Sequence, residues 1–313
     1  MTCPHNILKC LTKFRPTTTW LLVGVALGAL KVIPMINNWR KKERFQQSIK
    51  EFKQDVVYLY GFPRPTGGLN LSPPVIKVES FLRLAAIPYV YIATRDTTIS
   101  PTERFPMIVH NGNIVSDSTF IVEYLVQAYN VKVDASLTAE QRAVGLGARR
   151  LLEANSSWCL YRSLVVDSTK AIVPFFAKEF GVARIVAKVM IYFVRKSMIK
   201  TLNTIGNGDL TDIQYRAEHL ADVQALEALI GKNKYIVAEE LTTYDCAVFN
   251  HLASTYYLIH SVEGLDRFPA MQFLQQSSLL RNYHDTILLQ LFPDVQFITN
   301  DVSRKTRQEF TKK

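Results

Sequence analysis

The sequence VVYLYGFPRPTGGLNLSPP at residues 56–74 begins the part of the chain that decides the fold. Its apolar start predicts a strand, the segment rich in Pro and Gly predicts a loop, and Ser72-Pro73-Pro74 is a typical helix start. The same signals predict three more elements: a strand at 89–93, a strand after Phe105-Pro106 and a helix from Asp117-Ser118. This alternation of strands and helices predicts an α/β domain over residues 55–130.

Two features of this stretch suit a peptide-like ligand. Pro106 stands just before an apolar strand and fits a cis peptide bond, which turns the backbone of Phe105 outward to pair with an extended ligand. Asp117-Ser118 places free N–H groups and a hydroxyl at a helix N-terminus, where the α-carboxylate of a γ-glutamyl group can bind. Glutathione is a ligand of this kind. Asp117-Ser118 is equally compatible with an ordinary helix cap.

The same stretch resembles a known protein family. Residues 57–62, together with Leu71-Ser72-Pro73 and residues 77–83, are similar to the opening of the failed axon connections family. That family includes nematode cadmium-responsive proteins and is related to metaxins and glutathione S-transferases. The second half of the chain resembles the family at Arg195, Lys200, Gly206, Gly208, His219-Leu220, Asp222, Ala225-Leu226, Leu229-Ile230-Gly231 and Leu241-Thr242-Thr243-Tyr244-Asp245.

The resemblance covers roughly residues 55–295 and implies a glutathione S-transferase fold. We expect a thioredoxin-like N-terminal domain over 55–130 and an all-α C-terminal domain over 131–298. The resemblance implies thiol binding or weak glutathione conjugation in xenobiotic or metal stress, with glutathione as a co-substrate and a small electrophile as its partner. The alternative is a non-catalytic, metaxin-like adaptor at a membrane, with a homodimer or a metaxin-like protein as its partner.

Ser72 is the candidate catalytic residue. Glutathione transferases lower the pKa of the glutathione thiol with a hydroxyl donor, whereas glutaredoxin-like relatives use a cysteine at the same helix N-terminus. This chain has Val75 where the resemblance leads us to expect that cysteine, so the Ser72 hydroxyl remains. Tyr60, near the end of the first strand, is the tyrosine-type alternative. Each also has a simpler interpretation, Ser72 as a helix cap and Tyr60 as a packing residue.

An apolar segment precedes the α/β domain. Residues 17–30 carry no charge, and the apolar run continues beyond Lys31. The whole run has about twenty residues, which is near the length needed to cross ~30 Å of hydrocarbon. We therefore expect a short tail at 1–16 and a single transmembrane anchor at 17–37. A cleaved signal peptide is the alternative. The basic cluster at 40–44 favours a cytosolic main domain by the positive-inside rule.

Most of the net charge lies at the two ends of the chain. Of the net charge of +10, residues 1–44 contribute +7 and residues 303–313 contribute +4, which leaves −1 for residues 45–302. This predicts a basic linker at 38–54 and a basic tail at 299–313. A nucleic-acid-binding protein needs a basic stripe on its folded surface, so the balanced folded part excludes that class.

Cysteine and histidine usage gives no metal site. The chain has four cysteines, of which only Cys159 and Cys246 lie in the folded part, and no C-x-x-C. Few cysteines suit a reducing compartment and offer no thiolate cluster for a soft metal ion. The Asn70-Leu71-Ser72 triplet matches the glycosylation pattern, which matters only for a lumenal domain.

Past residue 130 the pattern becomes helical. Two capping boxes, Thr138-x-x-Gln141 and Thr211-x-x-Gln214, predict helix starts, and Gly231 predicts the C′ residue of the second helix. A third box, Thr242-x-x-Asp245, predicts a structural cap for a helix that the core buries. Residues 182–199 are apolar, but four basic residues interrupt them and indicate an amphipathic bundle helix instead of a second span. Glu79 and Arg83 have the spacing of a surface ion pair.

Overall fold

The computed structural model describes residues 39–231, 233–299 and 307–310 of the chain. The chain divides into two compact units, Met1–Phe52 and Lys53–Lys313. In the first unit, the described part of the basic linker is helical over residues 39–49. The anchor predicted at 17–37 lies outside the described residues. Within the described residues, no helix has the length and apolar character needed to span a membrane.

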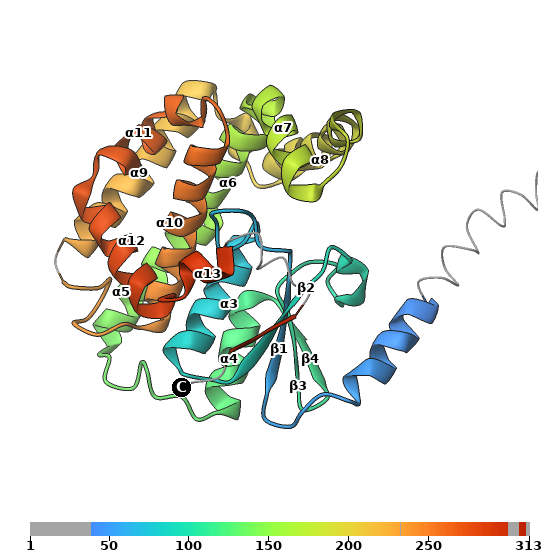
Figure 1. The fold of residues 1–313 in the computed structure, drawn as a ribbon. Helices are drawn as coiled ribbons and strands as arrows, with labels where there is room; N and C mark the ends of the chain where they lie inside the picture. Colours follow the sequence, from blue (N-terminus) through green and yellow to red (C-terminus); the bar gives the residue numbers. More distant parts are fainter. Residues whose placement is uncertain (1–38, 232, 300–306, 311–313) are drawn as a thin grey trace, which may run out of the picture. The chain divides into compact units, whose positions relative to one another are not determined.

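The second unit begins with a mixed β-sheet (Figure 1). Strand β1 pairs in parallel with β2 and antiparallel with β3, and the strand order is β4-β3-β1-β2-β5. The elements of this part are β1 (Val57–Gly61), α3 (Pro73–Leu84), β2 (Tyr89–Ala93), η1 (Thr97–Ile99), β3 (Met107–His110), β4 (Asn113–Ser116) and α4 (Ser118–Ala128). The predicted strands and helices are present in the predicted order, and β4 is an additional strand that was not predicted.

One strand of the sheet comes from the other end of the chain. Strand β5 (Arg307–Phe310) pairs antiparallel with β2, with Tyr91 opposite Gln308. The sequence predicts only a basic tail there, so this strand is a difference from the expectation. A four-residue segment that pairs across more than two hundred residues of chain has no local signal beyond its own composition.

The central strand is buried because helices cover the sheet. All five residues of β1 are buried. Helix α3 contacts β1, α4 contacts β3, and the two helices contact each other. Helix α10 then packs along α3 and joins the sheet layer to the helical part. This packing explains why residues 75–82 of α3 are buried on all sides.

From residue 129 to residue 299, the described residues form helices and connecting turns only. The elements are α5 (Ala139–Arg150), η2 (Leu151–Ser156), α6 (Ser157–Tyr161), η3 (Arg162–Asp167), α7 (Thr169–Phe180), α8 (Arg184–Thr204), η4 (Asn207–Asp209), α9 (Asp212–Ile230), α10 (Thr243–Ser261), η5 (Leu265–Arg267), α11 (Pro269–Gln276), α12 (Ser278–Leu291) and α13 (Val295–Thr299). Their apolar faces form one core, which includes Leu152, Leu226, Phe249, Leu252 and Leu274.

The capping boxes predicted at Thr138 and Thr211 are formed. The Thr138 amide donates to Gln141 Oε1 at 2.9 Å, and the Gln141 amide donates to Thr138 Oγ1 at 3.2 Å. The same reciprocal pair occurs at the start of α9. The prediction for Gly231 is wrong in its geometry, because this residue follows α9 with a φ of −62° and keeps the right-handed conformation.

The third predicted box lies deep in the core. Asp245 is 0% exposed, and its carboxylate accepts hydrogen bonds from both the amide (2.8 Å) and the hydroxyl (2.6 Å) of Thr242. It also accepts from the Ile236 amide at 2.9 Å and from the Tyr283 hydroxyl at 2.6 Å. Asp245 therefore caps α10 and also holds two further segments of the helical part together.

Candidate functional site

The start of α3 presents a serine hydroxyl that does not cap the helix. Ser72 occupies the N-cap position in an extended conformation, and Pro73 and Pro74 fill the first turn, where a proline breaks no helical hydrogen bond. The Ser72 side chain makes no capping hydrogen bond. Its hydroxyl instead donates to the carbonyl oxygen of Phe105 at 3.4 Å. Ser72 is half-buried.

Phe105 lies beside Ser72 because of the loop that precedes β3. The Phe105-Pro106 peptide bond is cis, as predicted. Phe105 is 7% exposed, and its ring packs edge-on against Phe62, with 5.3 Å between ring centroids. The side chain is thus fixed in the core, and the backbone of Phe105 borders the start of α3.

The start of α4 has an unusual backbone. Asp117 is the N-cap residue, and its carboxylate accepts from the Thr119 amide at 2.8 Å. Its φ of 74° and ψ of 129° are uncommon for a residue with a side chain, and such strain is often found at functional sites. Ser118 is 9% exposed, and among the described residues its hydroxyl has no hydrogen-bond partner. The helix start therefore offers a hydroxyl and amide groups to an anionic ligand.

Asn70 positions the loop that carries Ser72. Its Oδ1 accepts from the Ser72 amide at 2.9 Å, while its Nδ2 donates to the Phe62 carbonyl at 3.1 Å and to the Tyr91 hydroxyl at 2.5 Å. A Cβ at Gly61 would lie 2.5 Å from the Tyr91 hydroxyl, so glycine makes room for this contact. Asn70 is 2% exposed, so its side chain serves the fold and is not accessible as a glycan acceptor.

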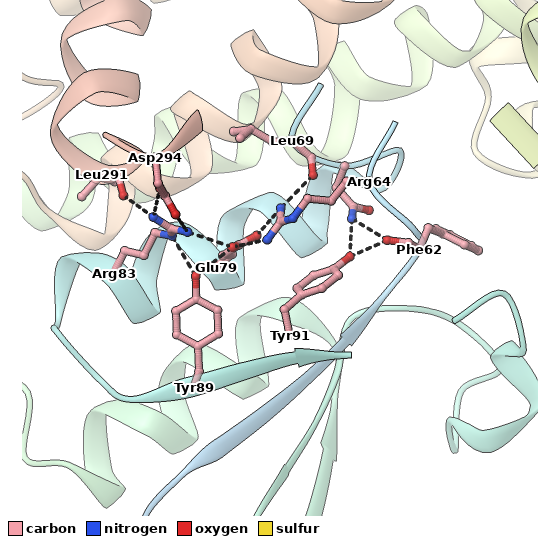
Figure 2. Close-up of polar contacts among 10 residues, drawn as sticks. Phe62, Arg64, Leu69, Glu79, Arg83, Tyr89, Tyr91, Leu291 and Asp294 are labelled. Atoms are coloured by element: carbon pink, nitrogen blue, oxygen red, sulfur yellow. Dashed lines mark hydrogen bonds and ion pairs between the residues drawn. The ribbon is translucent and has the colours of Figure 1, made fainter. Parts of the chain in front are cut away.

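A buried ion pair between Arg64 and Glu79 supports the same loop (Figure 2). Arg64 donates to both carboxylate oxygens of Glu79, at 2.6 and 3.0 Å, and also to the Leu69 carbonyl at 2.9 Å. Its guanidinium lies over the Tyr91 ring, 4.3 Å from the ring centroid. Glu79 is 0% exposed. Although burial alone would raise the pKa of Glu79, the cations of Arg64 and Arg83 hold it below its usual value.

The interpretation of Glu79 and Arg83 as a surface pair is therefore wrong. Arg83 reaches from Glu79 to the C-terminal part of the unit, where it donates to both carboxylate oxygens of Asp294, at 2.6 and 3.1 Å, and to the Leu291 carbonyl (Figure 2). The Tyr89 hydroxyl also donates to Glu79, at 2.8 Å. Spacing alone cannot distinguish the two cases, because i and i+4 residues share a face on any helix.

An apolar cavity of about 190 Å³ adjoins the start of α3. Leu71 and Pro73, the two chain neighbours of Ser72, contribute to its wall. The remaining wall is mostly aromatic and comes from the loop after β1 and from the helices α6, α7 and α10: Phe62, Tyr161, Phe175, Phe176, Phe180 and Tyr257. Phe176 and Phe180 stack with 4.0 Å between their ring centroids. The aromatic run of α7 is the one sequence signal for this cavity.

The other candidate residues occupy different surroundings. Tyr60 is 5% exposed within β1, opposite Ile92 of β2 and Met107 of β3. Val75 is 0% exposed, and the two described cysteines are free and buried. No group of three or more His, Cys, Asp or Glu residues that could hold a metal ion occurs in the described part of the chain.

Comparisons with known proteins agree with this architecture. A family model described as the glutathione S-transferase N-terminal domain matches residues 73–170. Failed axon connections of Drosophila melanogaster is 26% identical over 226 residues, which cover 69% of this chain and 54% of the relative. The chain is thus similar to failed axon connections, and residues 73–170 are similar to a glutathione S-transferase N-terminal domain. The chain spans about half the length of the Drosophila relative.

Glutathione transferases are also similar to this chain. The isoprene-epoxide glutathione S-transferase of Rhodococcus sp. (strain AD45) is 26% identical over 205 residues, which cover 63% of this chain and 85% of the relative. Among solved structures, glutathione S-transferase 1-6 from Anopheles dirus species B has a TM-score of 0.48 and 16% identity, over 80% of this chain and 96% of that chain. The sheet order and the family model together support a thioredoxin-like sheet layer followed by a helical part.

Proposed function

We propose that this protein binds glutathione at the starts of α3 and α4 and conjugates it to a small apolar electrophile. The observation that carries the proposal is the contact between the Ser72 hydroxyl and the backbone of Phe105, next to the cis proline. Ser72 holds the N-cap position but does not cap, so its hydroxyl is available for a ligand that displaces this contact.

Each part of glutathione has a counterpart in this chain. The cysteinyl backbone pairs with the backbone of Phe105, and the γ-glutamyl α-carboxylate accepts from the Ser118 hydroxyl and the amides at the start of α4. The glutathione sulfur then lies near Ser72 and the positive end of the α3 dipole, which favour the thiolate over the thiol. The thiol proton leaves to water.

The apolar cavity beside Ser72 supports an apolar electrophile. The relative from Rhodococcus is named for the conjugation of isoprene epoxide, and we extend this substrate class to the present chain. The thiolate attacks one epoxide carbon, so a C–S bond forms, the C–O bond breaks and the oxygen takes up a proton. Tyr161 lines the cavity, and burial raises its pKa, so its hydroxyl remains a proton donor at neutral pH.

A non-catalytic adaptor is the second candidate. Two observations favour it: the buried Val75 offers no thiol at the start of α3, and the Ser72 hydroxyl and the Phe105 carbonyl already satisfy each other. In this alternative, the protein keeps the fold for contacts with a metaxin-like partner or with a second copy of the chain.

We place this function at a membrane, with residues 17–37 as a single-pass anchor, the main domain in the cytosol and a role in xenobiotic or metal stress. Sodium carbonate extraction of membranes tests the anchor, and protease treatment of intact organelles tests the topology. We expect the chain to remain in the membrane pellet and its C-terminal part to be digested without detergent. Release into the supernatant contradicts the anchor, and full protection contradicts the topology.

The conjugation itself is tested with the full chain, glutathione and a series of epoxides. We expect turnover of small apolar epoxides and a raised KM in Phe176→Ala, because this change removes part of the cavity wall. Phe297→Ala, which truncates a 70% exposed phenylalanine on α13 outside the cavity, is the matched control. Glutathione binding without turnover of any epoxide would favour the adaptor.

A further inference from the structure

Helix α8 exposes an apolar surface to solvent. Fifteen large hydrophobic side chains are exposed among the described residues, and seven of them lie on this one helix, so they form a patch and not a scatter. Tyr192 and Phe193 are 62% exposed, and Ile185 is 68% exposed. We call this set the α8 patch: Ile185, Val186, Val189, Met190, Tyr192, Phe193 and Val194.

Helix α8 is packed against the rest of the helical part, although it exposes the α8 patch. The other side of α8 is packed, because Ala187, Ile191 and Leu202 are all 3% exposed or less. Helix α8 contacts α7 and the helical segments η3 and η4. In Figure 1 the α7–α8 pair lies at the edge of the helical part, away from α11 and α12. The helix is thus fixed by one face and presents the opposite face outward.

Positive charge surrounds the α8 patch. Helix α8 has no Asp or Glu, and it carries five basic side chains: Arg184, Lys188, Arg195, Lys196 and Lys200. No ion pair joins any of these five to the acidic side chains of the described residues. In the sequence, Lys188 lies between residues of the patch, and Lys196 and Lys200 come after the patch. All three lysines are exposed. The surface therefore combines apolar and aromatic groups with unpaired cations.

We infer that α8 docks onto an anionic membrane surface. An interfacial helix has large apolar and aromatic side chains on one part of its surface and lysines or arginines beside them, which contact lipid phosphates. Helix α8 does not meet the requirement for a span, so it lies in the plane of the interface. A symmetric contact with a second copy would place the same five cations against each other, which disfavours that occupant.

The test uses a polarity-sensitive fluorophore on single cysteines of the full chain. Cys3 and Cys10 are replaced by serine, and the buried Cys159 and Cys246 are left in place. The probe is attached at Phe193→Cys on the α8 patch or at Leu289→Cys, a 67% exposed control position on α12. Both proteins are reconstituted with phosphatidylcholine vesicles, with or without phosphatidylserine and with nitroxide-labelled lipid as quencher.

We expect the probe at 193 to shift to shorter wavelength and to be quenched several-fold more than the probe at 289, with phosphatidylserine increasing the difference. Lys188→Gln, Lys196→Gln and Lys200→Gln together should remove this increase. The triple lysine variant separates docking by α8 from attachment elsewhere in the chain, because it changes only α8. Equal quenching at 193 and 289 would overturn the inference. A blue shift at 193 that needs only a second copy and no lipid would also overturn it.

Discussion

The Ser72 hydroxyl donates to the carbonyl oxygen of Phe105 at 3.4 Å, although Ser72 stands at the N-cap position of α3. A serine at this position normally satisfies an amide of its own helix. Here Pro73 and Pro74 occupy the first turn, and the Ser72 amide donates a hydrogen bond to Asn70 Oδ1. The loop thus turns the hydroxyl toward the cis-proline segment, where we propose that glutathione binds.

The first prediction concerns the Ser72 hydroxyl. We expect Ser72→Ala to lower kcat for glutathione conjugation by about 10- to 100-fold, which corresponds to the ~1.5–3 kcal/mol of a hydrogen bond to a charged group. KM for glutathione should change little, because the hydroxyl matters most to the thiolate. Ser72→Thr should restore much of the rate. Ser197→Ala, at an exposed position of α8, is the neutral control. An unchanged kcat would assign Ser72 to the fold alone.

The second prediction concerns the buried ion pair under the loop. Arg64→Met leaves the Glu79 carboxylate buried without its main partner, and we expect a loss of about 3–5 kcal/mol in the free energy of unfolding. Arg64→Met combined with Glu79→Gln should recover part of this loss. Denaturant unfolding of the four proteins in the cycle measures the coupling. A fully additive result would show that the two side chains act independently.

The third prediction separates a buried cap from an exposed one. We expect Thr138→Ala, at the start of α5, to cost about 0.5–2 kcal/mol. Asp245→Ala should cost more, about 3 kcal/mol or above, because the donors on Ile236 and Tyr283 also lose their acceptor. Thermal unfolding of both variants gives the comparison. Equal losses would mean that Asp245 acts as a helix cap only.

The fourth prediction is a loss of stability in acid. Burial lowers the pKa of His219 to about 3 and that of His251 to about 4. Both values lie below the unfolded value of about 6.5, so the native state favours the neutral rings. The stability that they contribute is complete above pH ~6.5 and is lost as the pH falls toward 4. His219→Gln with His251→Gln should flatten the fall of Tm over this range. An unchanged slope would refute the assignment.

Local patterns in the sequence were sufficient for the elements around Ser72, Pro106 and Thr138, but not for the strands β4 and β5. The cis bond before β3, the helix start at Ser72 and the box at Thr138 each depend on neighbouring residues, and each is present. The buried ion pairs that support the site could not be predicted from neighbouring residues. Arg83 meets Asp294 across 211 positions of sequence, and nothing local marks such a partner.

The same limit applies to the surface of α8. The sequence indicates an amphipathic helix at 182–199, and the helix is present as α8. Periodicity predicts which residues can share a face of a helix. It does not predict whether neighbouring elements will pack against one face of that helix or against two. Only the packing of α7 and η3 on one side shows that Phe193 and its neighbours stay exposed.

The most direct test of the central claim is a calorimetric titration of the full chain with glutathione. We expect saturable binding at millimolar concentration or below, and a weakening of about 1.5–3 kcal/mol in Ser118→Ala through loss of a hydrogen bond to the γ-glutamyl carboxylate. Ser197→Ala should bind as the unchanged protein does. No binding of glutathione at millimolar concentration would contradict the enzyme and leave the adaptor.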